Sequence, residues 1–190
     1  MGSNFAPIFQ SRIRQKAFVA TNKACGDEIG LKAHDALPIP LLDAHQGEPQ
    51  MPNPTAAMLV IGDEILSGCT LDSNTNHLAK ELTAHGIDLC EVRVVSDDAR
   101  AIVAAVRALS DSFEHVFTSG GIGPTHDDIT ADCIAEAFDQ SIDIRDDARA
   151  LLAAHYERQG SELNEARLRM ARIPEGATLI DNPLSVAPGF

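Results

Sequence analysis

The segment 118–130, with the sequence TSGGIGPTHDDIT, constrains the fold and function of this chain more than any other part. It follows a short apolar run typical of a strand and precedes apolar residues at helical spacing. Gly120, Gly121 and Gly123 fall within four positions, and glycine tolerates positive φ and the close approach of a ligand. Free N–H groups in such a loop, beside a helix start, predict an anion site whose natural occupant is a phosphate.

The charged side chains of this segment have the opposite sign. Asp127 and Asp128 stand in it, and it contains no Lys or Arg. Phosphate and carboxylates share a small site readily when a divalent cation lies between them. We therefore expect a Mg²⁺-assisted site for a phosphorylated ligand. The alternative is a glycine turn in which Asp128 or Thr130 caps the next helix.

The rest of the chain from residue 56 alternates between strand and helix patterns. Strands are expected at 57–61, 87–95 and 114–118, and helices at 75–85, from Asp97 or Asp98 onward, and at 130–138. This order predicts an α/β fold, a parallel sheet with helices on both faces. Further on we expect an edge strand at 142–144, helices at 146–156 and 161–171, and a strand at 177–180. Cys90 and Cys133 are expected in the core.

Acidic residues follow each of the first three expected strands. Parallel strands meet at one edge of a sheet, where ligands bind, so these side chains are expected to converge: Asp63, Glu64, Asp97, Asp98, Asp127 and Asp128. Helix capping by Asp97 or Asp98 and a solvated Glu64 are the alternatives. Between the first strand and its helix, Ser67 and Asn74 could hold a ribose or a heterocycle, or residues 72–74 could simply cap the helix.

Composition excludes several classes of function. The net charge is −13 with a pI near 4.8, which argues against nucleic-acid binding through a basic surface. No apolar run approaches the ~18 residues that a membrane span needs. The four cysteines form no CxxC pair and have no zinc-ligand spacing, which favours a reduced, cytoplasmic protein.

Residues 1–54 differ from residues 55–190. They contain five basic and five acidic residues, so the entire net charge belongs to the remainder. We expect a poorly ordered extension, or a gene start assigned too early, with Met51 as a sensible start for the domain. The chain stops after the turn-like residues 187–190, which suggests a domain truncated at its carboxyl end.

Three motifs resemble the molybdopterin-binding-like domain, in particular its competence/damage-inducible protein A (CinA) amino-terminal branch. They are GDEILSG at 62–68, DSN at 72–74 and GGIGPTHDDIT at 120–130, and the terminal APGF also fits. The resemblance covers about residues 56–190. It implies a three-layer α/β/α sandwich with a mostly parallel sheet, assembled as a homo-oligomer such as a dimer or trimer.

The same resemblance implies that the domain catalyses one of two reactions that depend on a metal ion. Molybdopterin adenylyltransferases of the superfamily use Mg²⁺ and ATP, and their two key acids correspond here to Asp97 and Asp128. The CinA branch and the related domain of eukaryotic FAD synthases are linked instead to metal-dependent hydrolysis of ADP-ribose or FAD. The transferases tend to carry a basic residue where this chain has His126 and Asp127, which favours the hydrolase.

The first hypothesis is therefore a metal-dependent nucleotide pyrophosphatase with Asp97 and Asp128 as catalytic residues. Metal ligands, for Mg²⁺ or for Mn²⁺ or Co²⁺, are expected to be these two with Asp127 and Glu64. A phosphorylated nucleotide or pterin is expected to contact Gly62, Ser67, Asn74, Gly120, Gly121, Gly123, Pro124, Thr125 and Thr130. The alternatives are a module that binds molybdopterin or a nucleotide without turnover, and an adenylyltransferase in molybdenum cofactor biosynthesis.

Overall fold

The computed structural model describes residues 52–182 and 186–190. The expected extension, with the proposed start at Met51, lies almost wholly outside the described residues. Within them the chain forms β1 (Thr55–Ile61), α1 (Asp63–Leu66), α2 (Asn74–Ala84), β2 (Asp88–Val95), α3 (Ala99–Ser112), β3 (His115–Ser119) and α4 (Thr130–Ala137). Then follow β4 (Ile142–Ile144), α5 (Asp146–Arg158), α6 (Glu165–Leu168), η1 (Arg169–Ala171) and β5 (Arg172–Pro174).

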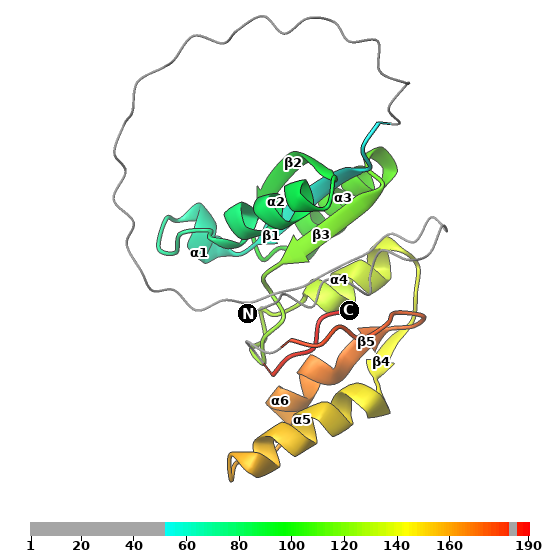
Figure 1. The fold of residues 1–190 in the computed structure, drawn as a ribbon. Coiled ribbons are helices and arrows are strands. Elements are labelled where there is room, and N and C mark those ends of the chain that lie inside the picture. The colour runs from blue at the N-terminus through cyan, green and yellow to red at the C-terminus, as the bar shows by residue number, and fades with distance from the viewer. Residues whose placement is uncertain (1–51, 183–185) are drawn as a thin grey trace, which may run out of the picture.

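A parallel sheet of order β2-β1-β3 forms the centre of the first half (Figure 1). β1 is its middle strand, because its run AAMLVI is buried at every position and can be covered on both faces. The register pairs Ile61 with Val95 and Val60 with Ser119. The three strands therefore end level with one another, at a single edge of the sheet.

Alternate side chains of the sheet enter two hydrophobic clusters. Ala57, Leu59 and Ile61 pack with residues of α3 and α4 on one face. Ala56 and Phe117 pack with Leu82 of α2 on the other. Helices thus cover both faces, and the fold is the expected α/β sandwich with a mostly parallel sheet.

The second half of the chain packs against α4 (Figure 1). β4 and β5 form an antiparallel pair, and buried residues of α5, η1 and β5 join the same cluster as α3 and α4. Ala187 and Phe190 belong to that cluster too, and Gly189 bridges Ile180. β5 and the last residues of the chain therefore lie beside the start of α4, directly after the loop 120–129, which we call the glycine loop.

Most expected elements are confirmed, with corrections near the carboxyl end. The single helix expected at 161–171 is wrong: α6 and η1 replace it, and the short strand is β5 rather than 177–180. Cys133 is buried as expected, whereas Cys90, which the register shift between β1 and β2 leaves unpaired, is exposed. None of the helices in the described part is long and apolar enough to cross a membrane.

Candidate functional site

The edge where the three parallel strands end carries most of the predicted acids. The N–H of Gly62 donates to the Val95 carbonyl at 3.1 Å, and the N–H of Asp63 donates to Oδ2 of Asp97 at 2.9 Å. The ends of β1 and β2 are thus joined directly. We call this region, made of Gly62, Asp63, Glu64 and Asp97, the sheet edge.

Several polar residues near the sheet edge serve the local structure. Oδ1 of Asp98 accepts the N–H of Ala101 at 2.9 Å and caps α3. Asp72 accepts the N–H groups of Asn74 and Thr75 at the start of α2. The capping alternatives are therefore confirmed for Asp98 and Asp72. The amide of Asn74 donates to the Ser119 hydroxyl at 2.7 Å and ties α2 to the end of β3.

The glycine loop is packed too tightly for larger residues. Gly120 has φ 103°, and a Cβ there would lie 1.9 Å from the carbonyl oxygen of Ile61. Gly121 has φ 62°, and its Cβ would lie 2.3 Å from Oγ1 of Thr130. Thr130 is fully buried, and its hydroxyl donates to the Gly120 carbonyl at 2.9 Å. Thr130 therefore holds the loop closed, and its expected contact with ligand stays a prediction.

The acidic end of the loop is a turn stabilised by Asp128. Its Oδ2 accepts the Thr125 N–H at 2.8 Å and also the Thr125 hydroxyl. Asp128 does not cap α4, whose capping residue makes no side-chain bond. Asp127 is exposed, and a hydrogen bond from Thr125, helped by its own backbone N–H, lowers the pKa of its carboxyl. Nδ1 of His126 lies 3.6 Å from Asp127.

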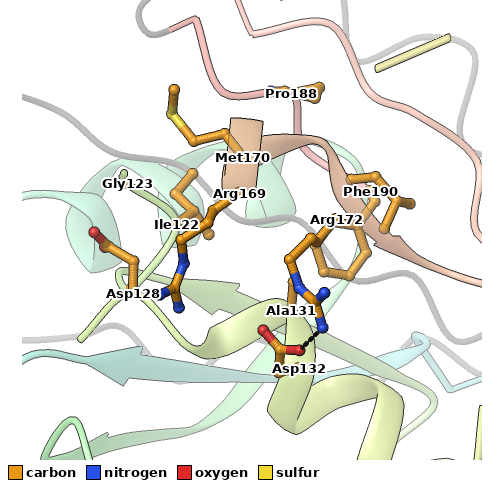
Figure 2. A pocket seen from close by; sticks show the side chains of 12 residues that line it. Ile122, Gly123, Asp128, Ala131, Asp132, Arg169, Met170, Arg172, Pro188 and Phe190 are labelled. Carbon is orange, nitrogen blue, oxygen red and sulfur yellow. Dashed lines mark hydrogen bonds and ion pairs between the residues drawn. The ribbon is translucent and has the colours of Figure 1, made fainter. Parts of the chain in front are cut away.

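A pocket opens between the glycine loop and the carboxyl-terminal segments (Figure 2). One wall is the loop itself with Asp128, and the other is η1, β5 and the last residues of the chain. We call it the loop pocket; its lining residues are Gly121, Ile122, Gly123, Asp128, Ala131, Asp132, Arg169, Met170, Arg172, Ile173, Pro188 and Phe190.

Two arginines in this pocket were not identified from the sequence. Arg172 donates to Asp132 of α4, and this bond raises the pKa of the arginine. Arg169 extends toward Asp128 across the pocket (Figure 2). Arg169 and Arg172 lie 46 and 49 residues after Gly123 in the sequence. The expectation that fixed cations are absent therefore holds for segment 118–130 alone, not for the folded pocket.

The predicted site residues thus divide between two places. Gly121, Gly123 and Asp128 line the loop pocket. The remaining predicted residues do not line it, and lie at the sheet edge, in α1 and α2, or along the loop: Gly62, Glu64, Ser67, Asn74, Asp97, Gly120, Pro124, Thr125, Asp127 and Thr130.

The expected metal ligands are not gathered into one group. Among the described residues, no three His, Cys, Asp or Glu side chains are placed together to hold a metal ion. Asp97 and Asp128 each use a carboxylate oxygen to accept a backbone N–H instead. Mg²⁺ is often held by only one or two carboxylates together with waters and substrate phosphates, so the metal and its ligands stay a prediction.

Comparison with known proteins identifies a family model and several relatives that match the described domain. A family model described as "Probable molybdopterin binding domain" matches residues 57–190. A CinA-like protein of Citrifermentans bemidjiense is 40% identical over 134 residues, covering 70% of this chain and 32% of that protein. A protein of Metallosphaera sedula is 38% identical over 137 residues, covering 72% of this chain and 52% of its own length.

A solved structure agrees with these relatives. The crystal structure of CinA from Thermoplasma acidophilum superposes with a TM-score of 0.66 at 35% identity, covering 72% of this chain and 80% of that one. The chain spans 52% of the length of the Metallosphaera relative and less of the CinA-like one. From the family match, these relatives and the shared fold, the chain belongs to the molybdopterin-binding domain family, in its CinA-type amino-terminal branch.

Proposed function

We propose that this domain binds a phosphorylated nucleotide or pterin in the loop pocket and hydrolyses a nucleotide diphosphate, of the ADP-ribose or FAD type, with a divalent metal ion. The observation that carries the proposal is the glycine loop at the pocket wall. Among the described residues, no hydrogen bond is donated by the N–H groups of Gly121, Ile122 and Gly123. Such free N–H groups are suited to phosphate oxygens.

Asp128 is the predicted catalytic acid that faces this pocket. It is half-buried, and its position is fixed by the Thr125 turn. A carboxylate held at the wall of a phosphate site is placed to orient a water molecule and to accept its proton. Asp97 lies at the sheet edge, outside the pocket lining.

The decisive assay is the release of AMP from ADP-ribose by the full 190-residue chain, with Mg²⁺, Mn²⁺ or Co²⁺. We expect turnover that excess chelator abolishes. We expect Asp97→Ala combined with Asp128→Ala to reduce it by more than about 100-fold, a loss typical of removing acid–base groups. Asp111→Ala, which removes an exposed carboxylate from α3, is the matched control. Undiminished turnover in the double variant would refute the hydrolase.

The structure also favours a second candidate, a module that binds without turnover. The carboxylates are spread over two places and do not form a metal centre among the described residues. Tight molybdopterin or nucleotide binding, with no product formed in any metal, would support this module. Adenylation of a pterin phosphate at the expense of ATP would instead indicate an adenylyltransferase.

A further inference from the structure

The wall of the loop pocket opposite the glycines is built by η1, β5 and the end of the chain. Met170 and Ala171 of η1 are buried, and the Arg145 N–H donates to the Ala171 carbonyl at 3.0 Å. These contacts fix the backbone that follows Arg169, and on the other side the Arg169 N–H donates to the Ala166 carbonyl. The side chain of Arg169, which is half-buried, extends from this fixed backbone into the pocket (Figure 2).

The two arginines of the pocket differ in their partners. Arg172 forms an ion pair with Asp132, which offsets its charge. Within the described residues, the side chain of Arg169 has neither a hydrogen bond nor an ion pair, and no contact of either kind joins it to Asp128 in Figure 2. Arg169 is therefore the pocket cation whose guanidinium donors are left for a ligand.

The opposite wall presents donors as well. Gly120 and Gly121 have positive φ, and the N–H groups of residues 121–123 make no hydrogen bond with described residues. Successive free N–H groups around residues of positive φ form a concave anion site. A guanidinium on the other side adds planar, paired donors that match phosphate oxygens. The two walls thus complement one anionic group between them.

We propose that Arg169 is the fixed cation that binds a phosphate group of the ligand, against the N–H groups of Gly121, Ile122 and Gly123. This rests on the proposed function only in that the ligand is phosphorylated; it does not require hydrolysis. It also alters the electrostatics deduced from the loop alone, because part of the phosphate charge is met by a protein cation. Phosphate binding then survives without metal.

The test is calorimetric titration of the full chain with inorganic pyrophosphate, and separately with inorganic phosphate, in excess chelator. We expect measurable pyrophosphate binding, weakened at least about tenfold by Arg169→Gln and less by Arg169→Lys, which keeps a point charge but not the paired donors. Arg149→Gln, which removes an exposed arginine of α5, makes the same change in net charge. It is expected to alter affinity less than about twofold, as a distant surface charge should.

Two results would overturn the proposal: no binding of either anion by the wild type in chelator, or equal affinities for Arg169→Gln and Arg149→Gln. Circular dichroism and thermal unfolding of both variants show whether a loss comes from unfolding. If the proposed hydrolase activity were absent, the results would differ from those that overturn the role of Arg169. AMP release from ADP-ribose would then be absent in every metal, while Arg169-dependent pyrophosphate binding would persist.

Discussion

The sheet edge and the loop pocket are neighbouring parts of one family domain, yet their charged residues do different things. At the sheet edge, Asp97 accepts a backbone N–H, and nearby Asp98 and Asp72 cap helices. At the loop pocket, the N–H groups of Gly121, Ile122 and Gly123 and the side chain of Arg169 have no hydrogen bond within the described residues. The polar groups of the sheet edge therefore stabilise the fold, whereas the N–H groups and the guanidinium at the pocket remain available to a ligand.

This difference shows what an acidic motif does not reveal about a site. Carboxylates at the ends of parallel strands predict a metal centre, which stays a prediction, because among the described residues no three such side chains are grouped. The positive charge that the pocket does hold comes from η1 and β5, which fold back beside α4. A site composed of distant segments has an electrostatic character that no single motif reveals.

The largest expected effect comes from a substitution in the glycine loop. Gly120→Ala places a Cβ 1.9 Å from the Ile61 carbonyl at φ 103°. We expect a loss of at least about 3 kcal/mol in the free energy of unfolding, since backbone strain adds to a clash that cannot relax. Gly160 has φ 64°, and a Cβ there would meet open space. For Gly160→Ala we therefore expect a loss of only about 1 kcal/mol in the free energy of unfolding. Urea titrations of both variants compare them, and equal losses would contradict the packing described.

Removal of the Thr130 hydroxyl should loosen the same loop. Thr130→Val keeps the shape of a fully buried side chain but deletes the bond to the Gly120 carbonyl. A loss of about 1–3 kcal/mol in unfolding free energy is expected, because a buried acceptor loses a partner. Thr178→Val, at an exposed position, should change stability by less than about 0.5 kcal/mol. A neutral Thr130→Val would mean that the hydroxyl does not hold the loop.

Single-charge substitutions separate the two regions directly. In excess chelator, Asp128→Asn should raise pyrophosphate affinity about threefold, because it removes a negative charge that faces the pocket. Asp97→Asn, at the sheet edge, should change the affinity by less than about twofold. Calorimetry on the two variants measures both values. A larger effect from Asp97 would place the anion at the sheet edge instead.

The smallest expected effect concerns thiols in the two regions. Burial, with a further contribution from Glu136 and Asp132, raises the pKa of Cys133 in α4 from 9.0 to about 11. Its thiol should resist alkylation at pH 8, whereas exposed Cys69, in the loop that follows α1, should react. Peptide mass spectrometry distinguishes the sites. Rapid labelling of Cys133 in the folded protein would show that α4 is not packed as described.

The same thiol makes stability depend on pH in a defined direction. The unfolded chain ionises near 9.0 while the folded state keeps its proton until about 11. The stabilisation is therefore complete below pH 9 and is lost as the pH rises toward 11. The urea midpoint should fall more steeply over this window for the wild type than for Cys133→Ala. Parallel curves would contradict the shift.

The parallel sheet could be predicted from the sequence because its signals are local. The buried run of β1 and the helical spacing in α3 are readable in windows of a few residues. The glycine loop was predicted for the same reason. The role of Thr130 was not, because the bond from this buried residue to the Gly120 carbonyl depends on how the loop closes. Homo-oligomerisation and the bound metal stay predictions.

Only the glycine wall of the loop pocket could be predicted from the sequence. Its glycine wall lies within a motif, but Arg169 belongs to a segment expected as one helix, 161–171, and Arg172 directly follows that segment. The short η1 turn and the pairing of β5 with β4 set their positions. Those features depend on contacts distant in sequence, where local periodicity carries no information. The Arg-bearing composition of residues 161–172 was the only available signal, and it did not specify a location.

The most direct test of the account is a ¹⁵N chemical-shift titration of the chain with ADP-ribose, with and without Mg²⁺. The account predicts that the amides of Gly121, Ile122 and Gly123 shift most and saturate together, with smaller changes at Asp63 and Glu64. Shifts confined to the sheet edge, or absent from the glycine loop, would contradict the claim that this pocket is the ligand site.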